Sequence, residues 1–335
     1  MVSLHLNGRA NRPGEPIHFQ FVVTNLGSAR TPRPTTNPSI DVKTIPDWLK
    51  EDYPFAPHKF TTPRGAQMSY VDEGEGDEAV LMVHGNPTWS FYYAKLIRTI
   101  SPQLRCIAPD HIGMGLSEKP EDYSYDLETR IADLEALVAC LGLKKVHLVV
   151  HDWGGAIGFG FATRHPELIG RLVVLNTAAF PSEHIPTRIA ACRFPFLGPL
   201  VVRGANGFAG PAVWMSMNRR KLNDTEKKAL LLPYDSWGNR VAVNGFVQDI
   251  PMNSRHKTWD TLTEVGEGLK QFEQSSMLIV WGGRDFCFND HFYDEWTKCF
   301  PHAKTHYLKD AGHYVLLDAD EEVLPEISKF LTSSN

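Results

Sequence analysis

Short apolar segments that recur along the chain constrain its fold more than any other feature. Each segment is apolar throughout, is closed by a turn and is followed by a stretch with helical spacing. Strands that are apolar on both faces are typical of a parallel sheet with helices on both sides. The series therefore predicts an α/β protein with a mostly parallel central sheet. The predicted strands are 79–83, 105–109, 146–150, 171–176, 277–281 and 305–308.

Two neighbouring segments extend this sheet domain. Residues 58–74 contain two short alternating runs around Pro63-Arg64-Gly65, which predicts a β-hairpin. Residues 127–142 have apolar side chains at helical spacing and end on a glycine, which is a common helix stop.

One long gap interrupts the series of strands. Between Asn176 and Met277 no strand pattern occurs, and helical pieces with several tryptophans fill the region. A helix near 259–272 completes the sheet domain, and we expect 181–253 to form an inserted helical cap. Large apolar residues in such a cap commonly line a buried pocket. The predicted sheet domain then consists of residues 41–180 and 254–335.

The first 40 residues differ from the rest in composition. They are rich in Pro, Gly, Asn and Thr, and the stretch R-T-P-R-P-T-T-N-P at 30–38 cannot build a helix or a central strand. We expect residues 1–40 to be a flexible arm. The single early Arg9 and the short apolar run at 19–23 make a poor secretory signal. No apolar run approaches the roughly 18 residues that a membrane span needs.

The overall composition argues against several classes of partner. The formal net charge of −5 gives no electrostatic reason to expect nucleic acid or an anionic membrane. The five cysteines are odd in number and show no C-x-x-C spacing, so we expect reduced thiols in the cytoplasm. No histidine pair has metal-ligand spacing on a helix and no nucleotide-binding motif occurs, so neither a metal nor a cofactor is predicted. No sequence feature sets the number of subunits.

The segment L-V-V-H-D-W-G-G-A-I-G (148–158) places an aspartate at a sharp turn. A buried strand ends there, and Gly154 and Gly155 permit a tight turn into a helix. This is the G-x-S-x-G nucleophile-elbow pattern with Asp152 in place of serine. Asp152 would sit at the N-terminus of the next helix, where the helix dipole favours an anion. The alternative is that Asp152 only caps that helix.

Two further residues complete a triad in chain order. Asp285 follows the strand at 277–281, and His313 follows the last strand within D-A-G-H-Y. The order nucleophile, acid, base matches the α/β-hydrolase order. Taken alone, Asp285 is better suited to a salt bridge with Arg284 or to capping a loop than to catalysis.

An ionised aspartate attacks an sp³ carbon directly and forms an alkyl ester. His313 would then activate water against that ester, oriented by Asp285. The backbone N–H groups of Asn86, within H-G-N-P-T, and Trp153 would form the oxyanion hole. The indole N–H of Trp153 and the amide of Asn86 are neutral donors suited to a leaving halide. Alternatively, Asn86 only forms an Asn-Pro turn and Trp153 only packs beneath the cap.

The motifs H-G-N-P-T, H-D-W-G-G, W-G-G-R-D and D-A-G-H-Y together resemble those of the haloalkane dehalogenases, from about residue 45 to the end. The resemblance implies an α/β-hydrolase fold, Asp152 as nucleophile, His313 as base, Asp285 as acid, and Asn86 with Trp153 as the halide-binding pair. Some members carry the acid as Glu after the preceding strand, where this chain has Asn176. The Asn-Trp pair with a late Asp is similar to the third subfamily. The segment 110–120 is similar to a loop of the family, and we assign it a structural role.

That subfamily is also similar to the β-lactone decarboxylases of long-chain olefin synthesis, which share these residues. Haloalkane dehalogenation is the first hypothesis, with a small apolar substrate, water as co-substrate and halide as product. β-Lactone decarboxylation is the second. Epoxide hydrolysis is the third, for which Tyr234 is a candidate donor but no second tyrosine is evident. A hydrolase fold kept as a non-catalytic binding module is the remaining alternative.

Overall fold

The computed structural model describes residues 2–3, 24–25 and 45–333. It divides into two units, residues 1–37 and residues 38–335. In the first unit, β1 (Val2–Ser3) pairs antiparallel with β2 (Thr24–Asn25). The remainder of the predicted flexible arm at 1–40 lies outside the described residues, so that expectation stays a prediction.

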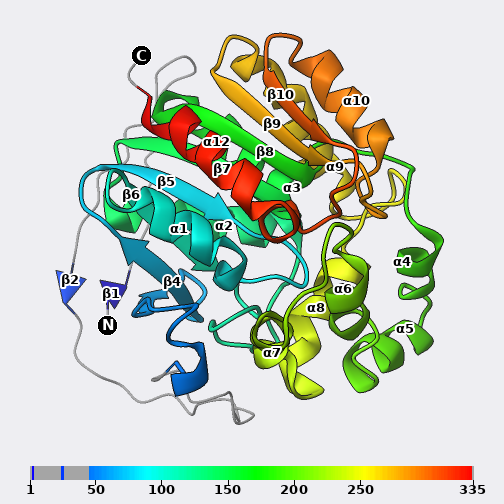
Figure 1. Ribbon diagram of the computed structural model, residues 1–335. Coiled ribbons are helices and arrows are strands. Elements are labelled where there is room, and N and C mark those ends of the chain that lie inside the picture. Colours follow the sequence, from blue (N-terminus) through cyan, green and yellow to red (C-terminus); the bar gives the residue numbers. More distant parts are fainter. Residues whose placement is uncertain (1, 4–23, 26–44, 334–335) are drawn as a thin grey trace, which may run out of the picture. The chain divides into compact units, whose positions relative to one another are not determined.

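A sheet of eight strands forms the centre of the second unit, in the order β10-β9-β8-β7-β5-β6-β4-β3 (Figure 1). The hairpin β3–β4 and the pair β4–β6 are antiparallel, and the other neighbours are parallel. The sequence therefore predicted the mostly parallel sheet and its hairpin correctly. The strands are β3 (His58–Thr61), β4 (Gln67–Glu73), β5 (Glu78–Val83), β6 (Arg105–Asp110), β7 (Lys145–Asp152), β8 (Ile169–Thr177), β9 (Met277–Gly282) and β10 (Lys304–Leu308).

Helices cover both faces of this sheet, and side chains alternate between the two sides as strand geometry requires. Along β5, Val80 and Met82 join one apolar cluster with the helices α1 and α12, whereas Leu81 and Val83 join the other with α2 and α3. This two-sided burial is why the strands are apolar throughout. The flanking helices are α1 (Ala94–Ile100), α2 (Leu127–Leu141), α3 (Gly154–Arg164), α9 (Trp259–Gly268), α10 (Asp290–Cys299), α11 (Val315–Asp318) and α12 (Asp320–Thr332).

Local sequence signals set the ends of α2. The side chain of Asp126 accepts a hydrogen bond from the Thr129 backbone N–H at its start. Gly142 ends the helix in the left-handed conformation, with φ 62°. The predicted helix at 127–142 is thus confirmed to within one residue.

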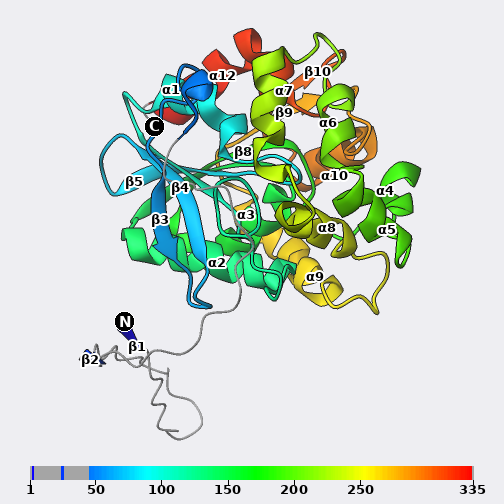
Figure 2. The same cartoon turned by 90° about the horizontal axis from the view of Figure 1, so that it is seen from below.

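The chain between β8 and β9 contains only helices and loops, as the gap in the strand series predicted. Figures 1 and 2 show α4 to α8 grouped at one end of the sheet. We call residues 181–253 the cap. Its helices are α4 (Thr187–Ala191), α5 (Leu197–Pro199), α6 (Ala209–Met215), α7 (Asp224–Leu231) and α8 (Val241–Gln248).

Short 3-10 or π helices connect several of these elements. They are η1 (Asp47–Leu49), η2 (Ser90–Tyr93), η3 (Pro166–Leu168), η4 (Leu200–Gly204), η5 (Leu232–Tyr234), η6 (Gly238–Arg240) and η7 (Leu269–Phe272). Within the part of the chain that the structure describes, every helix is too short or too polar to cross a membrane.

Candidate active site

A cavity of about 360 Å³ lies between the cap and the loops that follow the carboxyl ends of the strands. That volume is within the usual range of small-molecule sites. Polar groups are few, and they include Asn86, Asp152 and His313. The lining is otherwise mainly apolar, with Trp153, Phe180, Ile185, Ile189, Phe208, Met215, Val247, Ile250, Leu262, Phe286, Phe288 and Phe292.

The turn at Asp152 is as sharp as the sequence predicted. Asp152 ends β7 in the left-handed region, with φ 53°. A Cβ added at Gly154 would lie 1.9 Å from the carbonyl oxygen of Val83, so the turn passes directly against β5. A Cβ added at Gly85 would lie 2.0 Å from Oδ1 of Asp152. Glycine is therefore required on both sides of this carboxylate.

Backbone amides hold the Asp152 carboxylate in place. The Asn86 N–H donates to Oδ1 at 2.6 Å, and the Trp153 N–H also donates to this carboxylate. Burial raises the pKa of Asp152 above its usual value, although His313 and the two amides oppose that shift. The two amides predicted for an oxyanion hole thus converge on this carboxylate.

His313 lies between two carboxylates. Its Nδ1 is 2.7 Å from Oδ2 of Asp285, and its Nε2 is 3.7 Å from Oδ2 of Asp152. The backbone N–H of Cys287 donates to the other oxygen of Asp285 at 2.6 Å. Burial alone lowers the pKa of His313, but Asp285 and then Asp152 outweigh it and raise the pKa. The structure therefore brings together the three residues that the sequence predicted as a triad.

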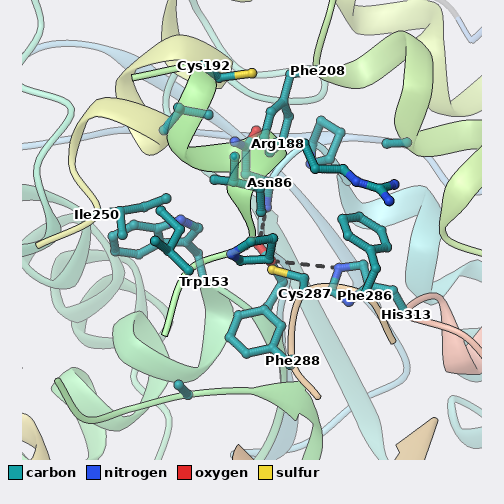
Figure 3. Close-up of a pocket in the computed structure, with 18 of the residues that line it drawn as sticks. Asn86, Trp153, Arg188, Cys192, Phe208, Ile250, Phe286, Cys287, Phe288 and His313 are labelled. Carbon is teal, nitrogen blue, oxygen red and sulfur yellow. Dashed lines mark hydrogen bonds and ion pairs between the residues drawn. The ribbon is translucent and has the colours of Figure 1, made fainter. Parts of the chain in front are cut away.

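Aromatic side chains enclose the histidine in Figure 3. The ring of Phe288 stacks on His313 with a centroid distance of 5.9 Å, and Phe286 lies 6.2 Å away. The thiol of Cys287 also lines the cavity, and burial raises its pKa well above the usual value. The sequence analysis missed these three neighbours, although F-C-F directly follows Asp285 and was available as a signal.

The side chains of the predicted donor pair face the cavity in different ways. The Asn86 amide nitrogen already donates to the carbonyl oxygen of Val243 in the cap, at 3.1 Å. Its Oδ1 is buried and has no hydrogen-bond partner among the described residues. The Trp153 ring packs against Phe246 with a centroid distance of 5.5 Å. The Asn86 amide thus retains one N–H for a ligand.

Three other buried histidines, His84, His111 and His151, bond to backbone, as is typical of residues that organise turns. His84 and His111 each contact the loop after β5, through the carbonyl oxygens of Gly85 and His84. His151 lies 2.9 Å from the carbonyl oxygen of His313. Asp110 accepts hydrogen bonds from two backbone amides, which fits the structural role assigned to its loop. None of these four residues lines the cavity.

Tyr234 does not reach the cavity, so its candidacy as an epoxide donor is wrong. Its hydroxyl donates to the carbonyl oxygen of Thr88 and accepts from the Gly115 N–H, and its side chain is buried in the core. Among the described residues that line the cavity there is no tyrosine. Within the same described part of the chain, no group of three or more His, Cys, Asp or Glu could hold a metal ion.

Comparison with known proteins agrees with this arrangement. The family model of the alpha/beta hydrolase fold matches residues 78–320. The chain is 43% identical to the cis-3-alkyl-4-alkyloxetan-2-one decarboxylase of Shewanella oneidensis, over 84% of this chain and 90% of that protein. It is 41% identical to the protein of that name from Xanthomonas campestris, over 83% of this chain and 97% of that protein.

A solved structure with the same fold is that of haloalkane dehalogenase DbeA from Bradyrhizobium elkani. It is 26% identical in sequence with a TM-score of 0.73, and the match covers 83% of this chain and 97% of that one. The fold, the family match and the two more similar relatives all agree. The chain belongs to the α/β-hydrolase family, and within it to the group that includes the cis-3-alkyl-4-alkyloxetan-2-one decarboxylases and, more distantly, the haloalkane dehalogenases.

Proposed function

We propose that this protein decarboxylates β-lactones with an alkyl group on each of the two ring carbons, using Asp152 as nucleophile. The observation that carries the proposal is the 43% identity to a protein named for this activity, over 84% of this chain. The dehalogenase of known structure is only 26% identical. The proposal reverses the order suggested by the motifs, which ranked dehalogenation first, and makes the reaction a lyase reaction without a halide product.

The reaction balances without water. Asp152 attacks the ring carbon that bears the ring oxygen (C4), which breaks that C–O bond and forms an alkyl ester. The ring carboxyl group is released as a carboxylate on the adjacent carbon (C3). The bond from C3 to this carboxylate then breaks, and its electron pair forms the double bond. The ester C–O bond breaks in the same step, giving carbon dioxide, an alkene and the free Asp152 carboxylate.

The same geometry determines the stereochemistry of the alkene. Attack from the side opposite the ring oxygen inverts C4 and places the new ester oxygen antiperiplanar to the carboxylate on C3. Elimination then needs no rotation about the C3–C4 bond. A cis-disubstituted lactone therefore gives a cis alkene.

Each part of the site has a task in this sequence. The N–H groups of Asn86 and Trp153 stabilise charge on the oxygens of Asp152 as its ester breaks. The free N–H of the Asn86 amide and the indole N–H of Trp153 would hold the released carboxylate. The apolar lining accommodates the alkyl groups. Protonated His313 would keep Asp152 ionised despite burial.

Dehalogenation remains the second candidate, because one observation favours it directly. The same donors, Asn86 and Trp153, lie beside the nucleophile, in the fold of a haloalkane dehalogenase. Here His313 acts as a base on water, because a simple alkyl ester has no carboxylate to eliminate. Water is then a substrate of the reaction.

The test compares two substrates with one purified protein. A cis-dialkyl β-lactone is incubated and alkene and carbon dioxide are counted, and a bromoalkane is incubated and bromide is counted. Asp152→Ala is the blank for both. Fast alkene formation with only trace bromide supports the proposal. Bromide release at an equal or higher rate, with no alkene, would instead assign the protein to dehalogenation.

A further inference from the structure

The exposed apolar surface of the described chain is concentrated on the cap. Its large exposed apolar side chains are Phe194, Phe196, Leu197, Leu200, Val201, Trp214 and Trp237, and all seven belong to residues 181–253. Phe196 is 89% exposed and Trp214 is 66% exposed. Five of the seven lie within residues 194–201, and exposed apolar residues that cluster mark an interaction site more often than scattered single residues do. We call residues 194–201 the apolar ridge.

The ridge lies at the outer edge of the cap. Figures 1 and 2 show α4 and α5 at the periphery of this unit, away from the sheet in both views. Phe196 has φ 63°, a backbone conformation that bulky residues rarely adopt. Such a conformation persists where the surroundings hold it and is common at functional segments. The Phe196 side chain lies in solvent rather than in the core.

The elements around the ridge also form the cavity wall. Ile189 of α4 and Cys192 just after it line the cavity, and the ridge begins two residues later. On α6, Met215 lines the cavity while Trp214 is exposed. A surface helix normally has a polar outer face, and a helix that is apolar on both sides has a second apolar neighbour. The cavity supplies one apolar side, and on the outer side Lys227 lies 4.5 Å from the centre of the Trp214 ring.

Charge around the ridge differs from that of the whole chain. The net charge is −5, yet the sequence between Glu183 and Asp224 has six basic residues and no acidic one. Arg203, Arg219 and Arg220 pair with carboxylates outside this segment. Arg188 and Arg193 form none of the ion pairs found among residues 45–333, and Arg193 donates to the carbonyl oxygen of Ile250. Aromatic and aliphatic side chains beside arginines that have no carboxylate partner are typical of protein surfaces that enter the headgroup region of an anionic bilayer.

We infer that the apolar ridge docks on an anionic lipid surface, with Phe194, Phe196 and Leu200 inserted among the acyl chains. This inference rests on the proposed function and deepens it. A lactone with two alkyl chains partitions into lipid, and the apolar ridge would place the wall of the cavity at the lipid surface. The net charge of the sequence gave no reason to expect an anionic membrane, because a total charge does not show where Arg188 and Arg193 lie.

The test measures binding of the full chain to vesicles without substrate. Flotation with vesicles of phosphatidylcholine and phosphatidylglycerol should exceed flotation with phosphatidylcholine alone, and high salt should reduce it. The triple variant Phe194→Ser, Phe196→Ser, Leu200→Ser should lose at least about tenfold in affinity for the mixed vesicles. Its side chains are exposed and line no part of the cavity, so the fold should persist. The control variant Lys144→Ser, Lys298→Ser removes exposed cations outside the cap and should bind normally.

Three outcomes would overturn the inference. The protein could fail to float with either vesicle, or the triple variant could float as well as the wild type. Alternatively, light scattering could show that the wild type is an oligomer which the triple variant dissociates, with vesicle binding unchanged, so that a second copy covers the ridge. Decarboxylation of a short-chain lactone in buffer without vesicles tests the proposed function separately, since it does not depend on the ridge.

Discussion

At the scale of single residues, His313 separates the two candidate reactions. In dehalogenation the alkyl ester on Asp152 is removed by water, for which His313 is the base. In lactone decarboxylation the ester breaks by elimination and needs no base.

We therefore expect His313→Asn, incubated with a bromoalkane, to accumulate an alkyl ester on Asp152, seen as a mass increase of the intact protein. The same variant with a cis-dialkyl lactone should accumulate no adduct, because the carboxylate on C3 expels Asp152. Asp152→Asn is the control that forms no ester with either substrate. Accumulation of a stable adduct with the lactone would contradict the elimination step.

The pH dependence of kcat/KM follows from the same pair. The pKa of Asp152 is raised by burial, so its carboxylate is lost on acidification at a higher pH than for a free aspartate. Lactone turnover should therefore fall on the acid side only. The pKa of His313 is raised above 6.5 by Asp285 and Asp152, so a reaction that uses neutral His313 should keep rising with pH above that value. Measured pH profiles with lactone and with bromoalkane should differ on this alkaline side. Identical profiles would count against His313 acting as a base in dehalogenation alone.

At the scale of elements, the elbow depends on close packing between β5 and α3. We expect Gly154→Ala to destabilise the protein by about 1–3 kcal/mol and to abolish activity, because its Cβ would meet the Val83 carbonyl oxygen. Gly210→Ala is the matched control, since its added Cβ meets nothing closer than 3.8 Å. Urea unfolding and lactone turnover check both variants. Full activity of Gly154→Ala would mean that the turn at Asp152 can shift away from Val83 without loss of function.

Sequence patterns predicted the strands well and the cap less fully. Each buried strand repeats one simple rule, apolar on both faces, and every predicted strand is present. Within the cap, short helices such as α4 (Thr187–Ala191) and α5 (Leu197–Pro199) carry little periodicity. Their apolar residues divide between cavity and solvent, and spacing alone does not distinguish the two.

Some residues of the candidate site could be predicted from the sequence, but their contacts could not. The order of Asp152, Asp285 and His313 along the chain identified residues that the structure brings together. The bond from the Asn86 amide to Val243, and the burial of Tyr234 away from the cavity, depend on how the cap folds back on the core. Such contacts between distant segments leave no local pattern.

At the scale of the whole molecule, one buried ion pair joins the core to the cap. Arg130 of α2 lies 3.8 Å from Asp249, just after α8, and stacks 3.6 Å from the ring centre of Phe246. Burial lowers the pKa of Arg130 to about 10 and raises the pKa of Asp249. Both side chains have atoms without hydrogen-bond partners among the described residues.

We expect Arg130→Met to cost about 3–5 kcal/mol of unfolding free energy, because Asp249 is left buried without its partner. The double variant Arg130→Met, Asp249→Asn should recover much of that loss, since no lone charge remains. Lys144→Met breaks an exposed ion pair with Asp77 and serves as the control, with no measurable change expected. Urea unfolding measures all three. Equal losses for the single and double variants would show that packing rather than charge holds this contact.

The insertion of the cap between β8 and β9 has a consequence for how such enzymes diversify. Asn86, Asp152, Asp285 and His313 all lie outside residues 181–253, at the end of a core strand or on a loop of the core. Mutations that reshape the cap can therefore accumulate while the reacting groups are inherited unchanged. Related proteins can thus keep the same reacting groups and still come to act on different substrates. The changes can all lie in the single continuous stretch of the gene that encodes residues 181–253.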